Sequence, residues 1–145
     1  MHSAVAAGAA LLLPASWSML HAGTRGRLVV YKSPTCGCCK KWVEHVRQNG
    51  FETEVHDTDN VGAVKQQHGL PAALASCHTA LIDGYVIEGH VPADLIRKLL
   101  DEHPALAGLA VPGMPQSAPG MDIGNSPYEV IAFDRTGKQL VYAKR

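Results

Sequence analysis

The sequence has no surplus of charge and few aromatic residues. Thirteen basic residues balance thirteen acidic ones, and only 6 % of the 145 residues are aromatic. Proteins that bind nucleic acid concentrate positive charge against the phosphates, and those that bind single strands add aromatic platforms for the bases. We therefore exclude nucleic acid as a partner. No internal repeat is present, and the length fits one domain with its own core.

The sequence also lacks a basic residue (Lys or Arg) in its first 20 positions, where an apolar run occupies residues 2–13. This run is too short to cross a bilayer, which takes about 20 residues, but it resembles the apolar region of a secretory signal. Ala22 and Gly23 are small enough for a cleavage junction. We expect residues 1–22 to be a leader removed on export to the periplasm, after which the chain has no stable membrane insertion. The alternative is a buried N-terminal helix.

Hydrophobic spacing and turn residues predict alternating strands and helices. The predicted strands are 27–31, 51–56, 79–82 and 85–87, and the predicted helices are 36–49, 61–68 and 92–102. Asp83-Gly84 is typical of a tight turn between two strands. The order β-α-β-α-β-β-α predicts an α/β fold of thioredoxin-like type, as a single metal-binding domain over 23–145. Other small α/β folds share part of this order, and the position of the cysteines favours the thioredoxin-like one.

Beyond Pro104 the composition changes. Residues 104–126 are rich in glycine and proline, contain two methionines and show no periodicity, which predicts a long loop. Residues 128–133 and 139–143 flank a turn and predict a C-terminal β-hairpin.

Cysteines are few but crowded. Three of the four, Cys36, Cys38 and Cys39, lie within four positions, and Cys77 stands alone. A disulfide framework spreads its cysteines, so crowding favours a metal or redox site. Cys36 and Cys39 share one face at the start of a predicted helix, where free N–H groups and the helix dipole favour thiolates. Thiolates attack disulfides and also bind metals, so the pair alone does not separate these chemistries; an inert disulfide is a third reading.

Cys77 decides between them. It directly precedes the third strand, where thioredoxin-like oxidoreductases carry a cis-proline facing the cysteine pair, and the nearest proline here is Pro71. A third sulfur facing the pair predicts a thiolate site for copper(I), with zinc as the other candidate. The alternative is a buried cysteine that acts as a small hydrophobic residue.

Further ligands have weaker support. Cys38 could be a fourth ligand, a resolving thiol or a partner contact, and His90 follows the predicted hairpin at the end where the cysteines gather. Met114 and Met121 lie in the loop, and thioethers favour copper(I) over zinc; alternatively, they pin the loop to the domain.

The remaining histidines and the nearby lysines receive no metal role. We expect His78 to point away from Cys77 if the strand has begun there. Surface positions are expected for four histidines, and solvated positions for three lysines: His45, His56, His68, His103, Lys32, Lys40 and Lys41.

Four motifs, CGCCK (36–40), SCHTA (76–80), EGHVP (88–92) and GLAVPGMP (108–115), resemble a family of small exported bacterial proteins. The family was catalogued as a domain of unknown function, and its members are often labelled metal-binding and linked to periplasmic copper handling. The resemblance implies a copper-binding or copper-resistance role, with Cys36, Cys39 and Cys77 as candidate ligands.

Three functions follow. The favoured one is a periplasmic copper(I)-binding protein that acts in copper handling or resistance, as a chaperone, scavenger or resistance factor, with other metal-handling proteins as candidate partners. The alternative is a thiol–disulfide oxidoreductase with Cys36 as nucleophile and Cys39 as resolver; arsenate reduction is a narrower version that lacks an arginine-rich pocket. The third is an interaction module, in which loop 104–126 and the C-terminal hairpin dock on a metal-export partner.

Overall fold

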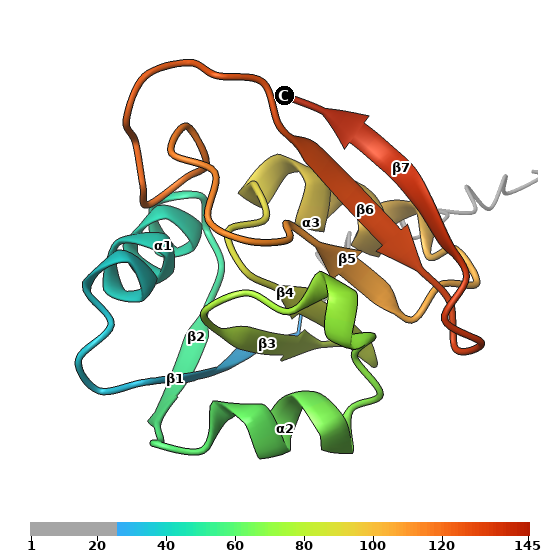
Figure 1. Ribbon diagram of the computed structural model, residues 1–145, viewed down its shortest axis with the longest axis horizontal. Helices are drawn as coiled ribbons and strands as arrows, with labels where there is room; N and C mark the ends of the chain where they lie inside the picture. Colours follow the sequence, from blue (N-terminus) through green and yellow to red (C-terminus); the bar gives the residue numbers. More distant parts are fainter. Residues whose placement is uncertain (1–25) are drawn as a thin grey trace, which may run out of the picture.

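A mixed seven-stranded sheet is the centre of the fold (Figure 1). The computed structural model describes residues 26–145, so the leader predicted over 1–22 lies outside the described residues. The strands are β1 (Leu28–Lys32), β2 (Thr53–Asp57), β3 (Thr79–Ile82), β4 (Tyr85–Glu88), β5 (Gly108–Ala110), β6 (Glu129–Phe133) and β7 (Gln139–Lys144). Their order in the sheet is β2-β1-β3-β4-β5-β6-β7. β1 pairs parallel with β2, and β4 with β5, whereas the other four pairings are antiparallel.

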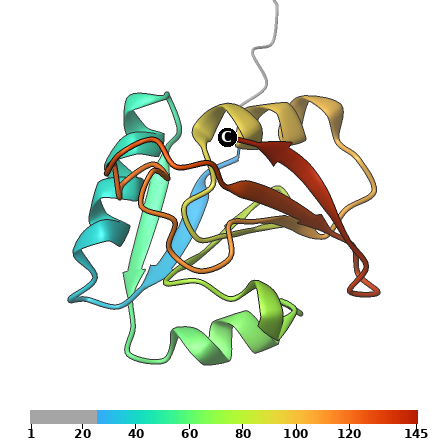
Figure 2. The same cartoon turned by 45° about the horizontal axis from the view of Figure 1, so that its top comes forward.

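Helices cover both faces of this sheet (Figure 2). α1 (Gly37–Gln48) and α3 (Ala93–Glu102) pack on one face, because their buried residues join a single cluster with alternate residues of the strands. The short helix α2 (Val61–Gln67) and the 3₁₀ turn η1 (Ala72–Leu74) lie on the other face. There Leu74 packs with Val86, Ala110 and Phe133 in a second cluster. Among the helices of residues 26–145, none combines the length and the hydrophobicity that a membrane span requires.

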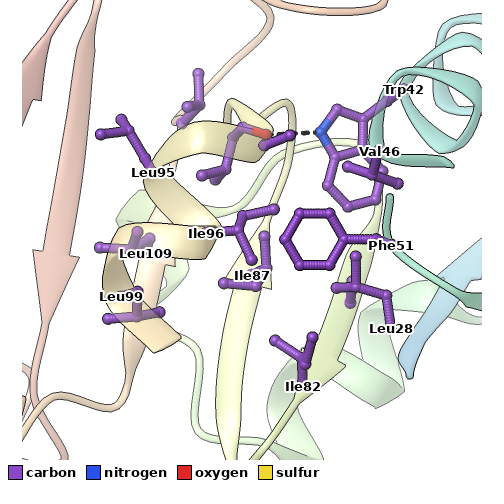
Figure 3. Packing of buried hydrophobic residues seen from close by; sticks show 14 of the residues in the cluster. Leu28, Trp42, Val46, Phe51, Ile82, Ile87, Leu95, Ile96, Leu99 and Leu109 are labelled. Atoms are coloured by element: carbon purple, nitrogen blue, oxygen red, sulfur yellow. Dashed lines mark hydrogen bonds between the residues drawn. The ribbon is translucent and has the colours of Figure 1, made fainter. Parts of the chain in front are cut away.

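The larger cluster positions α1 (Figure 3). Trp42 is fully buried, and its indole N–H donates to the Val91 carbonyl at 2.9 Å, the dashed bond in the figure. Val46 and Phe51 pack beside it at the end of the helix, which stops at Asn49 and Gly50. The buried Trp42 ring and its hydrogen bond to Val91 together attach α1 to the rest of the fold. The start of α1 is therefore held at a defined place above the sheet.

His45 differs from its predicted surface position. The side chain is half-buried between α1 and α3, and its Nε2 accepts the backbone N–H of Ala93 at 3.2 Å. Pro92, which precedes α3, offers no capping side chain, so His45 satisfies one of the free donors at the helix start. Burial lowers the pKa of His45, an effect that Asp122 and Asp94 partly offset, and only the neutral ring accepts this bond.

The order β-α-β-α-β-β-α and the C-terminal hairpin are confirmed, as part of a mixed α/β fold. The thioredoxin-like comparison stays a prediction. The prediction of a long loop over 104–126 is wrong at residues 108–110, because β5 lies there and pairs with both β4 and β6. Three residues are too few to show a period, and only Leu109 among them is large. A Cβ atom at Gly108 would lie 1.9 Å from the Val86 carbonyl oxygen, so this close pairing requires glycine.

Replacing Leu109 tests the position of β5. Leu109 is fully buried, so we expect Leu109→Ala to lower the free energy of unfolding by about 2–5 kcal/mol. Leu140→Ala on β7 removes a half-exposed leucine and should change the free energy of unfolding by less than about 0.5 kcal/mol. Urea denaturation of both variants measures the difference. Equal, small effects would mean that residues 108–110 are a surface loop.

Candidate metal centre

Four sulfur atoms meet where α1 begins. The Sγ atoms of Cys36, Cys38, Cys39 and Cys77 all lie within 4.8 Å of one another. The structure thus brings together the three sulfurs predicted to converge and adds Cys38, whose place the sequence left open. Three of the cysteines come from one helix start, and the fourth comes from the segment before β3, about forty residues away in the chain.

Cys36 and Cys39 are joined by a disulfide, with an S–S distance of 2.05 Å. Cys36 precedes the first residue of α1, and its sulfur accepts the Cys39 backbone N–H at 3.3 Å. Once the disulfide is reduced, the start of the helix stabilises a negative charge on this sulfur, because the helix N–H groups point at it. In the disulfide state neither sulfur is a thiolate, so binding of a metal by this pair requires prior reduction.

Cys38 and Cys77 are free thiols, and both are half-buried. Cys38 Sγ lies 3.5 Å from Cys36 Sγ. Burial is the main reason that the pKa of Cys77 rises to about 11, and the neighbouring Cys38 adds to it. Cys77 is therefore a neutral thiol in this state, and a metal that binds it would have to displace its proton.

His90 is oriented toward Cys77. Its Nδ1 lies 2.6 Å from the Pro119 carbonyl oxygen, an acceptor, which assigns the ring proton to Nδ1. The unprotonated Nε2 then faces Cys77 Sγ at 3.1 Å. Burial lowers the pKa of His90, which keeps the ring neutral. A neutral imidazole whose other nitrogen is held by a carbonyl is the usual form of a histidine metal ligand.

His78 lies on the same side, contrary to expectation. β3 begins at Thr79, so the alternation of a strand does not yet apply at His78, and its Nδ1 lies 3.4 Å from Cys77 Sγ. The ring is fully buried against Trp42, with 4.4 Å between ring centroids. Its Nε2 has no hydrogen-bond partner among the described residues. Burial is the main reason that the pKa of His78 lies well below its usual value. Together with Cys77 and His90 it forms a second group of converging ligand atoms.

A buried carboxylate holds the segment that carries Cys77. Glu88 Oε1 accepts the Ser76 backbone N–H at 2.6 Å, and Glu88 Oε2 accepts the Thr79 hydroxyl at 2.6 Å. Lys65 of α2 completes the network with an ion pair to Glu88 Oε1 at 2.5 Å. The network therefore holds the chain on both sides of Cys77, through the Ser76 backbone N–H and the Thr79 side chain. Sequence patterns did not predict it, although an acidic residue that ends an otherwise apolar strand was the available signal.

The segment between β5 and β6 passes beside the start of α1 (Figures 1 and 2). Gly120 has a φ of +89°, and a Cβ atom there would lie 2.7 Å from the Trp42 backbone nitrogen and 3.1 Å from His90 Nδ1. Glycine is therefore needed for the segment to approach the helix this closely.

The two predicted methionine ligands are on this segment. Met114 is 49 % exposed and follows Gly113, whose carbonyl accepts the Ser76 hydroxyl. Met121 is half-buried and follows Gly120. Each methionine directly follows a glycine that contacts the site, Gly113 or Gly120. The role of the two methionines as metal ligands stays a prediction.

Lys32 is not solvated as expected. It is only 3 % exposed, and its Nζ forms an ion pair with Asp57 at 2.5 Å. Lys32 and Lys65 both contribute to the lowered pKa of His78, so the site has one buried and one partly buried cation near it. Lys40 and Lys41 are exposed, as predicted.

Comparison with known proteins identifies the family. Residues 74–121 match the family described as "Protein of unknown function, DUF411". Two solved structures, named "Copper resistance protein copG- Form 2" and "Form 1", are each 42 % identical in sequence, with TM-scores of 0.79 and 0.78. The match covers 83 % of this chain and 98 % of each of those chains. The chain belongs to the DUF411 family. No curated protein matches this DUF411 member. The resemblance inferred from its four motifs is thereby confirmed.

Removing the charge of Glu88 tests the network that holds Cys77. Glu88→Gln leaves the Lys65 ammonium without its carboxylate, so we expect the free energy of unfolding to fall by about 2–3 kcal/mol. We also expect faster alkylation of Cys77 in the folded protein, because the backbone beside it loosens. Glu102→Gln, which removes an exposed partner of Lys98, should change stability by less than about 0.5 kcal/mol. Unchanged stability and alkylation in Glu88→Gln would show that the network does not hold the segment.

Proposed function

We propose that the reduced protein binds copper(I) through its cysteine cluster and acts in copper handling or resistance in the periplasm. The observation that carries this proposal is the convergence of four Sγ atoms within 4.8 Å, beside a neutral histidine nitrogen. Cys36, Cys39 and Cys77 are the principal ligands, and Cys38 and His90 are within reach of the same ion. Met114 and Met121 are thioether candidates on the segment beside the site.

The donor set supports a soft metal. Thiolates favour copper(I), and zinc accepts the same sulfurs together with histidine. The names of the two similar structures include copper resistance, which supports copper over zinc. The site is half-buried and has neutral histidines, with the buried Lys32 and the partly buried Lys65 nearby. These lysines also suit a ligand set that becomes negatively charged on deprotonation.

The periplasmic location rests on the leader-like residues 1–22. Copper resistance proteins among the relatives are consistent with a role outside the cytoplasm. N-terminal sequencing of the protein from a periplasmic fraction should begin at Gly23, and recovery of the intact chain only from the cytosol would contradict export. Other metal-handling proteins in that compartment would supply or receive the ion.

Replacing Cys77 tests copper binding most simply. We expect the reduced protein to bind about one copper(I) ion, and Cys77→Ala to weaken binding by about 100-fold or more, because it removes a ligand from the cluster. The apparent affinity of the intact protein should rise with pH, since the thiol of Cys77, with a pKa of about 11, must lose its proton to bind. Competition with a copper(I) chelator measures both effects.

The matched control is His103→Asn. His103 adopts a left-handed conformation at the end of α3, which asparagine tolerates, and it contacts Tyr85 rather than the cysteines. Its copper affinity should equal that of the unmodified protein. Undiminished affinity in Cys77→Ala would remove Cys77 from the ligand set, and preferential retention of zinc over copper would overturn the choice of metal.

A thiol–disulfide oxidoreductase is the second candidate, favoured by the Cys36–Cys39 disulfide at the start of α1. In this function Cys36 would attack a substrate disulfide and form a mixed disulfide with it. Cys39 would then attack Cys36 Sγ, re-form the Cys36–Cys39 disulfide and release the substrate as a thiol. Reduction of a small disulfide substrate by metal-free protein separates the candidates. Turnover that is lost in Cys36→Ser but kept in Cys77→Ser would favour the oxidoreductase, whereas no turnover would exclude it.

A further inference from the structure

We propose that Cys38 and Cys77 form a second redox-active pair, so that the fully oxidised protein holds two disulfides. The pairing itself rests on the geometry of the site alone. Its consequence, that oxidation removes every thiolate from the copper site, rests on the proposed function.

The position of the two free thiols carries the proposal. Once Cys36 and Cys39 are joined, Cys38 and Cys77 are the remaining thiols of the described chain. Their sulfurs lie within 4.8 Å of each other, and both side chains are half-buried, so a small oxidant reaches them. A disulfide needs its sulfurs about 2 Å apart, a gap that rotation of two flexible cysteine side chains can close.

The surrounding structure directs Cys77 toward Cys38. Glu88 binds the Ser76 backbone N–H and the Thr79 hydroxyl, which keeps Cys77 at the start of α1. On the other side, Gly120 packs against the first turn of α1 so closely that a Cβ atom there would lie only 3.0 Å from the Cys38 carbonyl oxygen. The chain is therefore held next to Cys77 by Glu88 and next to Cys38 by the close approach of Gly120.

An internal exchange is the competing reaction. Cys38 Sγ lies 3.5 Å from Cys36 Sγ, so its thiolate could attack the existing disulfide and expel Cys39. That exchange moves one disulfide without a net change in oxidation, and it would leave the fully buried Cys39 as a thiolate. Burial disfavours this charge, so the existing disulfide is the more stable arrangement.

The oxidation balances with an external disulfide such as oxidised glutathione. The Cys38 thiolate attacks one sulfur of that disulfide, which forms a mixed disulfide and releases the first thiolate. Cys77 then attacks Cys38 Sγ, forms the Cys38–Cys77 bond and expels the second thiolate. The two protons of Cys38 and Cys77 end on the two released glutathione thiols, and two electrons pass from the protein to the oxidant.

The site therefore has two steps of oxidation. Formation of the Cys36–Cys39 disulfide leaves two cysteine sulfurs that can bind copper as thiolates. Formation of the Cys38–Cys77 disulfide then leaves none. The imidazoles of His78 and His90 then remain, and these bind copper(I) less well than thiolates do. Complete oxidation would release copper(I), and reduction would restore the site.

Intact-mass measurement tests the second pair. The reduced, metal-free protein is treated with excess oxidised glutathione, and free thiols are then alkylated. We expect the monomer to lose four hydrogen atoms and to take up no alkyl group. The double variant Cys36→Ser/Cys39→Ser keeps only the proposed pair and should lose two hydrogen atoms as a monomer.

The matched control is Cys38→Ser/Cys77→Ser, which should form only the Cys36–Cys39 disulfide. Two alkylated thiols in the oxidised unmodified protein, or only glutathione adducts and intermolecular dimers in Cys36→Ser/Cys39→Ser, would overturn the second pair. A copper(I) titration of the reduced unmodified protein separates the two hypotheses. Copper uptake without a second disulfide overturns the pair alone, and a second disulfide in a protein that binds no copper supports the pair while it removes the proposed function.

Discussion

The site depends on one buried carboxylate. Glu88 binds the backbone before Cys77, the hydroxyl after it and the ammonium of Lys65, so the loop that carries this cysteine is tied to the sheet and to α2 together. The start of α1 carries the other three cysteines, and the buried Trp42 ring holds this helix in place. Sulfurs from distant parts of the chain meet because buried contacts hold both of the segments that carry them.

The polar groups beside the sulfurs are matched to a neutral, partly desolvated environment. His90 is held by a carbonyl, and His78 is pressed against Trp42 with one nitrogen unpaired among the described residues. Burial lowers the pKa of both rings, which keeps them uncharged, and it raises the pKa of the Cys77 thiol, which stays protonated in the metal-free state. The Cys77 sulfur becomes negatively charged when a metal cation displaces its proton, so metal uptake is coupled to proton release.

Much of this arrangement could be predicted from local patterns. The spacing of Trp42, Val43 and Val46 predicts α1, and the place of Cys36 before its first turn follows from that. Long-range partners could not be read in the same way. Lys32 and Glu88 are buried because Asp57 and Lys65 meet them in space, and each partner lies more than 20 residues away in the sequence. β5 lacks a period, and His78 lies one residue before β3, where the alternation of a strand does not yet fix the direction of a side chain.

X-ray absorption at the copper edge of the reduced, copper-loaded protein tests the central claim most directly, because it counts the neighbours of the metal by element. The account predicts a copper(I) ion with at least three sulfur neighbours, to which Cys77 contributes one. A first shell of nitrogen and oxygen with a single sulfur or none would contradict it, since the converged cysteines would then not be the site of the metal.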